Sequence, residues 1–473
     1  GASAASKLSV VETVYDGAGQ VTKTIAYATR LATTVTLSES AIRSALVTDA
    51  NNDRTTRFFY GTDGLLAGQL DADGYLIENL YDAGGRLQQV KRYSTATVLA
   101  NRPSGSLTSL RPATVALLDQ VTSRYYDAQG RVSGDLDAAG YLTTYAYDLA
   151  NNKTGETRYS GATTYQAALS SVITAATTAT PSGQPVSRSQ SWTYDALSRV
   201  STQTNAEGTV TSYNYDGVTG FLNSVTVASG TDPRVTTNKY DALGRVTQTM
   251  KGEGSAALAA AGGNSAAQMA AWNSYATKYD YDLAGRLLKT TDPNGNATLY
   301  YYNRDGQLRY TVRAGQVVSG AVQGEVTEFL YNAFNEVTSI IQYATRVAMS
   351  GLTGGVIAST LPGLAADATK DRKTDSVFSK RGLLIRTTDA LGFVTDSEYT
   401  AFGQLLQRRT QQKLTATASL TTKIDTWTYD RTGDLKTSLR GSGGLAINES
   451  YVFDAFGRQT QKTDARGNLW QTN

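Results

Sequence analysis

Residues 126–148 read YDAQGRVSGDLDAAGYLTTYAYD, a stretch that holds one full copy of a short motif and the start of the next copy. Both copies begin with Tyr-Asp, and Tyr126 lies 21 residues before Tyr147. A second turn signal lies between them, with Asp137 eleven residues after Tyr126 and Gly140 three residues later. An Asp or Asn three residues before a Gly is typical of a type I turn that closes on a left-handed residue. The stretch therefore predicts β-hairpin turns joined by strands of about six residues.

The motif recurs along the chain in the general form Y-D-x-x-G-R-V/L. Five pairs of copies lie 21 residues apart, and each pair has the same internal Asp or Asn followed by Gly. Repetition of one small unit at fixed spacing is the sequence signature of a repeat protein. The fifteen copies begin at Tyr15, Tyr60, Tyr81, Tyr126, Tyr147, Tyr194, Tyr215, Tyr240, Tyr281, Tyr302, Tyr331, Phe378, Tyr399, Tyr429 and Phe453.

The motif residues have an expected structural role. Residues two apart share one face of a strand, and nine of the fifteen motif aromatics have another aromatic two positions earlier, so one sheet face is predicted to be aromatic. Stacked ring pairs could hold that face together. The arginine after the turn can lie over a ring or pair with the turn carboxylate. The residues expected in these roles are Tyr81, Asp82, Gly85, Arg86, Tyr126, Asp127, Gly130, Arg131, Tyr194, Asp195, Tyr240, Asp241, Gly244, Arg245, Tyr281, Asp282, Gly285 and Arg286.

Composition restricts the chemistry of the chain. It contains neither histidine nor cysteine, so the commonest general base and the thiolate metal ligands are missing. The net charge is only +3, which gives no basic excess to hold a nucleic acid. Most of the aspartates fall at turn positions. We therefore expect no enzymatic activity, no cofactor and no catalytic or metal site.

The repeats indicate one continuous array over residues 11–473, a fragment of a larger protein, preceded by a disordered start or cloning scar at residues 1–10. No apolar run approaches the ~18 residues that span a membrane, and no targeting signal is found in this stretch. Ser/Thr/Ala-rich inserts of some 20 residues follow Tyr27, Tyr93, Tyr159 and Tyr343. Their regular placement predicts that several of them lie on one edge or face of the array.

The copies YDALGRV, YDAQGRV and YDLAGRL, with DAxG turns between them, resemble the Rhs/YD-repeat family. The resemblance covers nearly the whole chain from about Tyr15. It implies an all-β fold in which tandem hairpins form a long, twisted antiparallel spiral sheet, as in the shells of bacterial Rhs proteins, insecticidal toxin complexes and the teneurins. The long inserts are a departure from many members of that family.

Two functions of different class follow. The first is a structural scaffold or shell segment of a large bacterial protein, secreted or on the cell surface, that encloses or displays a toxin or effector. The second is an adhesin whose exposed aromatics and inserts bind a carbohydrate or a protein. The expected partners are the rest of the polypeptide or neighbouring copies, an encapsulated toxin, or a surface glycan, with no nucleic acid and no membrane span.

Overall fold

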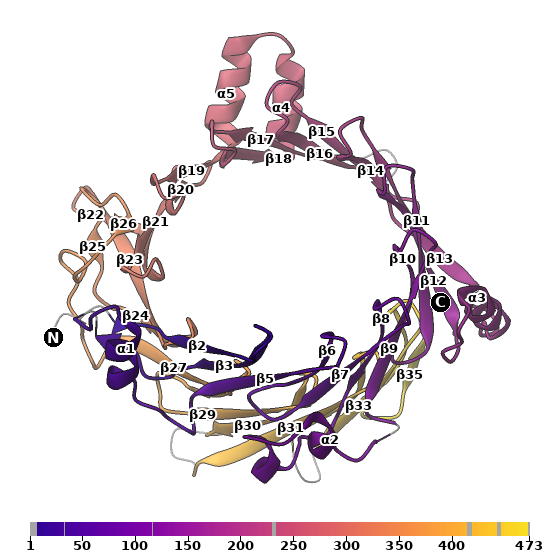
Figure 1. The fold of residues 1–473 in the computed structure, drawn as a ribbon. Coiled ribbons are helices and arrows are strands. Elements are labelled where there is room, and N and C mark those ends of the chain that lie inside the picture. Colours follow the sequence, from indigo (N-terminus) through magenta and orange to yellow (C-terminus); the bar gives the residue numbers. More distant parts are fainter. Residues whose placement is uncertain are drawn as a thin grey trace.

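The computed structural model describes residues 7–32, 34–115, 117–228, 233–413, 419–441 and 446–471. Residues 1–6, part of the predicted disordered start, lie outside the described residues. One long antiparallel sheet curls into a ring, and the helices lie on the outside of the ring (Figure 1). This confirms the predicted all-β spiral of tandem hairpins with short helical and loop inserts. No helix among the described residues is long and apolar enough to cross a membrane.

The strands are short because turn residues interrupt the chain at every hairpin. In chain order they are β1 (Lys7–Leu8), β2 (Val11–Tyr15), β3 (Val21–Ala26), β4 (Leu31–Ala32), β5 (Arg54–Tyr60), β6 (Leu66–Leu70), β7 (Leu76–Tyr81), β8 (Leu87–Arg92), β9 (Gln120–Tyr126), β10 (Val132–Leu136), β11 (Tyr141–Tyr147), β12 (Lys153–Ala162), β13 (Ser187–Tyr194), β14 (Val200–Thr204), β15 (Val210–Tyr215), β16 (Leu222–Ala228), β17 (Arg234–Tyr240), β18 (Val246–Lys251), β19 (Thr277–Tyr281), β20 (Leu287–Thr291), β21 (Ala297–Tyr302), β22 (Leu308–Val318), β23 (Ala321–Tyr331), β24 (Val337–Gln342), β25 (Val347–Ala348), β26 (Gly355–Val356), β27 (Arg372–Phe378), β28 (Leu384–Thr388), β29 (Val394–Tyr399), β30 (Leu405–Gln412), β31 (Thr421–Tyr429), β32 (Leu435–Arg440), β33 (Ile447–Phe453), β34 (Gln459–Thr463) and β35 (Leu469–Gln471).

The helices belong to the inserts. They are α1 (Glu39–Ala45), the 3-10 helix η1 (Leu99–Asn101), α2 (Leu107–Leu110), α3 (Leu169–Thr178), α4 (Glu253–Ala261) and α5 (Ser265–Tyr275).

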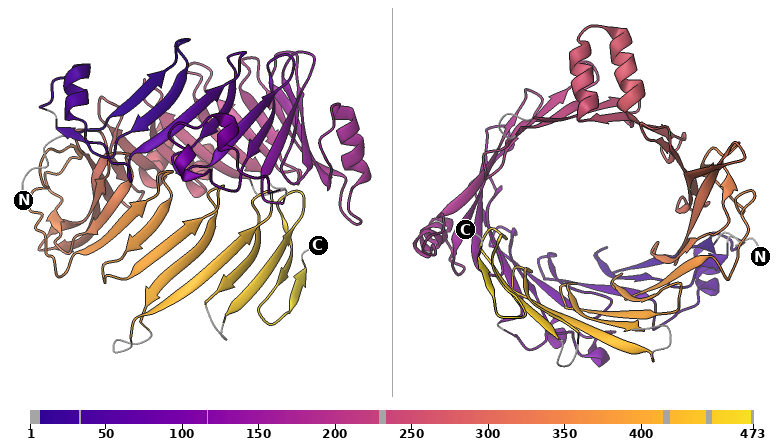
Figure 2. Two further views of the ribbon diagram at one scale, coloured as in Figure 1. Left: turned by 60° about the horizontal axis from the view of Figure 1, so that its bottom comes forward. Right: turned by 180° about the vertical axis from the view of Figure 1, so that it is seen from behind.

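Strand pairing follows chain order from β2 to β35, with β3 pairing directly with β5 and β24 directly with β27 across their inserts. The short strands β25 and β26 branch from β23 and β21. Within the described residues β2 pairs only with β3, and β35 only with β34, so no strand pairing closes the ring. The chain instead continues past one full circle. The strands from β23 onward, here called the second turn, come to lie alongside the first turn, as Figure 2 shows.

Consecutive hairpin turns alternate between two rims of the sheet, because each strand is antiparallel to the next. Two strands separate successive copies of the Tyr-Asp motif, so all motif turns lie on one rim, the motif rim. The second set of turns, which includes Asp137–Gly140, lies on the opposite rim together with the long inserts. This rim is here called the insert rim. The prediction that several inserts share one edge of the array is therefore confirmed.

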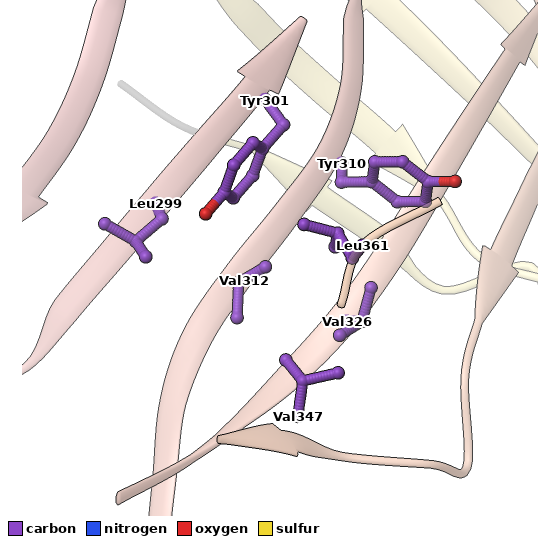
Figure 3. Packing of buried hydrophobic residues seen from close by; sticks show 7 residues of the cluster. All are labelled: Leu299, Tyr301, Tyr310, Val312, Val326, Val347 and Leu361. Carbon is purple, nitrogen blue, oxygen red and sulfur yellow. The ribbon is translucent and has the colours of Figure 1, made fainter. Parts of the chain in front are cut away.

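The deepest burial lies on the outer face of the sheet, beneath the inserts. Leu142 of β11 is fully buried together with Val172 and Ala176 of α3. A similar cluster joins β21, β22 and β23 to the insert that follows β24, where Val347 and Leu361 cover Val312 and Val326 (Figure 3).

The motif aromatics occupy the other face, since Tyr147 stands at odd spacing from Leu142 on β11. They therefore line the inner face of the ring.

Candidate wall-building interface

Most copies of the motif turn share one geometry, illustrated by Tyr126–Arg131, whereas the turn after Tyr215 is one residue longer. The backbone N–H of Asp127 donates to the carbonyl of Arg131 (2.9 Å), and the N–H of Gly130 donates to the carbonyl of Asp127 (3.0 Å). The Asp127 carboxylate accepts the N–H groups of Gln129 (3.0 Å) and Arg131 (2.9 Å). Gly130 has a φ of +79°, which few other residues adopt without strain.

Six copies carry the motif arginine, and in five of them it makes the same two contacts. Arg131 Nε donates to Asp127 Oδ2 (2.7 Å), while its guanidinium carbon lies 4.7 Å from the ring centroid of Tyr147 in the next motif. Both contacts recur with Arg86, Arg199, Arg245 and Arg286, which lie over Tyr126, Tyr215, Tyr281 and Tyr302. Each arginine therefore connects its own turn to the neighbouring hairpin.

These contacts lower the pKa of turn carboxyls such as those of Asp82 and Asp241. The N–H and guanidinium of Arg86 hold the pKa of the Asp82 carboxyl below its ordinary value. The pKa of Asp241 is lowered in the same way by the N–H of Arg245, reinforced by its guanidinium and opposed by partial desolvation. The folded turn therefore favours the charged form of these aspartate carboxylates.

The motif tyrosine provides a second connection between hairpins. The hydroxyl of Tyr147 donates to the carbonyl of Val132 (2.8 Å), the first residue of the strand that follows the preceding motif turn. Twelve motif tyrosines make this bond to the equivalent carbonyl: Tyr60, Tyr81, Tyr126, Tyr147, Tyr194, Tyr215, Tyr240, Tyr281, Tyr302, Tyr331, Tyr399 and Tyr429. Along the motif rim, tyrosine side chains on the inner face therefore bond each hairpin to the backbone of the preceding one.

Stacking of ring on ring, which the sequence suggested as the cohesion of the aromatic face, is not how the described rings are arranged. Only two ring pairs lie close among the described residues, Tyr125–Tyr165 and Phe221–Tyr240. Five motif rings instead have an arginine over them, namely Tyr126, Tyr147, Tyr215, Tyr281 and Tyr302.

The motif rim of the second turn lies against the insert rim of the first turn, and this contact is here called the seam (Figure 2). At one point Arg54 Nη2 donates to the two carboxylate oxygens of Glu336 (2.9 and 2.7 Å) and to the Ser379 carbonyl (3.1 Å). The side chains of Arg54 and Glu336 are only 18% and 14% exposed. Farther along, Lys380 Nζ donates to the Ala50 carbonyl (2.8 Å).

The seam continues around the ring with the same chemistry. Arg381 Nε donates to Asp73 Oδ2 (3.0 Å), and Gln120 Nε2 donates to the Arg431 carbonyl (3.2 Å). Arg158 of the first turn donates to the carbonyl of Ala455 in the second. Charged side chains of one turn therefore bind carbonyls and carboxylates in the hairpin turns of the other.

Aromatic residues at the tips of the docked hairpins complete the seam. Phe334 lies under Arg54, with 3.8 Å between the guanidinium carbon and the ring centroid, and Phe456 lies under Arg188 at 5.6 Å. The preceding alanines, Ala333 and Ala455, are 9% and 5% exposed. Leucines at tips of the first turn's motif rim are, by contrast, open to solvent: Leu149, Leu197, Leu243 and Leu283.

The sequence prediction singled out motif residues and missed this seam. All eighteen predicted residues lie in motif turns of the first turn of the spiral, where they join neighbouring hairpins to each other. The residues that join turn to turn include Arg30, Arg54, Arg158, Phe334 and Phe456. One signal was present in the sequence. The pair Ala-Phe occurs three times in the chain, at 333–334, 401–402 and 455–456, and each copy lies in a motif hairpin that belongs to the second turn of the spiral.

A family model matches part of the chain. Residues 176–319 match the family model described as Teneurin YD-shell. The resemblance to the YD-repeat family is confirmed. No curated protein matches the chain.

Two solved structures are similar to the chain at low identity. The crystal structure of TcdB2-TccC3 without its hypervariable C-terminal region is 13% identical, with a TM-score of 0.46 over 98% of this chain and 22% of that one. A mutant of the Photorhabdus luminescens Tc holotoxin pore is also 13% identical, with a TM-score of 0.45 over 98% of this chain and 24% of that one. The chain thus spans less than a quarter of the length of these two proteins.

Proposed function

We propose that this chain is a non-enzymatic section of shell wall from a large bacterial protein, secreted or on the cell surface, that encloses or displays a toxin or effector. The seam is the observation that carries the proposal. A repeat array needs only neighbour-to-neighbour contacts to fold, whereas the seam joins hairpins about 300 residues apart, such as Gln120 with Arg431 (311 residues). Contacts of this kind join successive turns of the spiral sheet into a continuous wall.

The eighteen predicted motif residues have a structural role in this proposal. Their aspartates and glycines shape the turns, and their arginines and tyrosines tie each hairpin to the next. In this proposal the motif residues stiffen each turn of the spiral, and the seam joins one turn of the spiral to the next.

Charge reversal at the seam tests the proposal. In Arg54→Glu the new carboxylate faces Glu336, and the loss of a largely buried pair costs about 3–5 kcal/mol locally. We expect the second turn to separate from the first, which raises the maximum dimension in small-angle X-ray scattering. The double variant Arg54→Glu with Glu336→Arg restores opposite charges and should recover the compact profile.

The control is Arg124→Glu, which breaks the exposed pair of Arg124 with Asp135 (2.8 Å) on adjacent strands of the first turn. Its scattering profile should stay close to that of the parent chain. A parent-like profile for Arg54→Glu would show that the seam does not hold the turns together.

The described residues give the adhesin alternative no specific support. Trp272 is the tryptophan of the inserts, and it is 5% exposed in a cluster with Met250 and Ala271. Dose-dependent signals on a glycan array that disappear on mutation of exposed insert aromatics would favour the adhesin instead.

A further inference from the structure

Two inserts of the chain are copies of one another. Residues 27–30 and 343–346 both read YATR, and the inserts end in DANNDR at 49–54 and DATKDR at 367–372. The equivalence places Arg54 and Arg372 at the same position. It also places one insert on the first turn of the spiral and the other on the second.

The two inserts have the same internal bonds. The N–H of Ala28 donates to Asp53 (2.8 Å), and the N–H of Ala344 donates to Asp371 (2.8 Å). Tyr27 donates to Glu12 (2.6 Å) and Tyr343 donates to Glu328 (2.6 Å). The strand registers agree as well, because Arg54 is opposite Ala26 and Arg372 is opposite Gln342. Sequence and geometry therefore describe one binding element built twice.

The first copy is occupied by a hairpin tip of the second turn. Arg54 holds Glu336 and covers Phe334, and Arg30 donates to the carbonyl of Asn332. The tip that fills this copy is residues 331–336, with the sequence YNAFNE.

The insert that follows Tyr93 has a residue with the same role at the position equivalent to Arg54. Asp119 accepts the N–H of Ser94 (2.9 Å) as Asp53 accepts that of Ala28. The next residue, Gln120, stands where Arg54 stands, and it too donates to a carbonyl of a docked tip, that of Arg431. The residue after the closing aspartate thus binds a hairpin tip in both of these first-turn inserts.

The second copy is open. Arg372 is exposed and forms no ion pair with the residues that the structure describes, whereas the Arg54 side chain is 18% exposed. Arg346 is paired with Glu325 of its own sheet (3.1 Å) and is 39% exposed, whereas Arg30 is 18% exposed.

A groove of about 1140 Å³ lies at this place, with Arg313, Lys370 and Arg372 in its wall. Its cations match the carboxylate and carbonyls that the occupied copy binds.

We propose that this groove receives a motif-rim hairpin tip of a further YD-repeat turn, with an Ala-Phe pair followed by an acidic residue, as in Asn332–Glu336. The inference rests on the proposed function and adds the partner that the wall takes at its free insert rim. The exposed first-turn tips of a second copy lack the Ala-Phe pair, so the tip comes from a turn of the 331–336 type.

The probe is a fluorescein-labelled cyclic peptide with the sequence of residues 327–342, closed at the position where Thr327 and Gln342 are paired in the sheet. Titration of the full chain, followed by fluorescence anisotropy, should give saturable binding at one site. Arg372→Glu and Arg346→Glu should each weaken binding at least 10-fold. A peptide with Phe334→Ala should bind more weakly than the parent peptide.

Lys251→Glu is the matched control, because Lys251 is an exposed cation on the insert rim outside the groove. It should leave binding unchanged, and thermal melts of all variants should match the parent. Absence of binding, or binding that survives both arginine variants, would overturn the proposal. Loss of binding in Arg54→Glu alone would also overturn it, since the peptide would then have displaced the docked tip. Any of these results leaves the scattering test of the wall itself unaffected.

Discussion

At the scale of single residues, the fold depends on backbone conformations that only certain side chains accept. The fifth residue of the motif turn has a positive φ in copy after copy, usually as glycine. Asn151, Ser198 and Asn335 fill the same position with φ values of 66°, 58° and 64°. Asparagine and serine are tolerated there because small polar side chains can visit the left-handed region, whereas β-branched residues are strained in it.

Gly130→Val should therefore destabilise the chain by about 1–3 kcal/mol through backbone strain. A side chain at Gly130 would meet nothing within 4 Å, so crowding does not contribute. Asp127→Asn should cost much less, because Asn205, Asn303 and Asn332 shape other turns of the chain in the same way. Thermal and urea melts of the two variants check this. Equal midpoints for both would contradict the assignment of the turn.

At the scale of elements, the hairpins that lie beneath an insert are held on two faces by different means. On the inner face the motif tyrosine and arginine bind the neighbouring hairpin. On the outer face an insert covers leucines and valines and supplies the hydrophobic burial that a lone hairpin lacks. The sequence prediction emphasised the aromatic face, yet the fully buried side chains include Leu76 and Leu142 of the outer face and Val172 of the helix that covers Leu142.

Leu142→Ala should accordingly cost about 2–5 kcal/mol, the usual loss for a leucine removed from a packed core. Leu149→Ala is the control, since Leu149 lies on a free tip and is fully exposed. Its stability should stay within about 0.5 kcal/mol of the parent. The experiment is urea unfolding followed by tyrosine fluorescence. Similar losses at both positions would mean that α3 does not pack on the sheet as described.

Acid should weaken the turns. The pKa values of Asp82, Asp195 and Asp241 are lowered in the folded chain by bonds from their motif arginines, so the folded state favours the charged carboxylates. A lowered folded pKa contributes stability that is complete above the unfolded pKa of about 4 and is lost as the pH falls through the folded pKa. The melting temperature should be level from pH 7 to about pH 5 and fall below about pH 4. A level melting temperature down to pH 3 would contradict this.

At the scale of the whole molecule, the sequence predicted the repeat and the architecture but missed the seam. Turns such as Asp127–Gly130 are encoded within a few residues, so local chemistry was sufficient to place them. The seam pairs residues such as Arg54 and Glu336, 282 positions apart, and these meet only because the curvature of the sheet brings the second turn beside the first. The curvature accumulates from small twists between many strands. The total curvature cannot be inferred from the sequence of any single repeat.

Two traces of the seam are nevertheless present in the sequence. Ala-Phe occurs only in motif turns that belong to the second turn of the spiral, and YATR occurs at the two inserts that have equivalent positions on successive turns. Both became interpretable once the rims were known. A search for residues that differ between otherwise equivalent repeats would have found them.

The spiral itself is tested most directly by cysteine cross-linking, because the chain contains no cysteine of its own. Lys380 Nζ lies 2.8 Å from the Ala50 carbonyl across the seam. In the double variant Ala50→Cys with Lys380→Cys, a short bis-maleimide should form an intramolecular link at high dilution, detected by mass spectrometry of the digest. The control pair, Ala50→Cys with Leu283→Cys, places the second thiol on an exposed tip of the first turn and should not be linked. Efficient linking of the first pair alone is the result predicted by docked turns, and equal linking of both pairs, or of neither, would contradict the spiral wall.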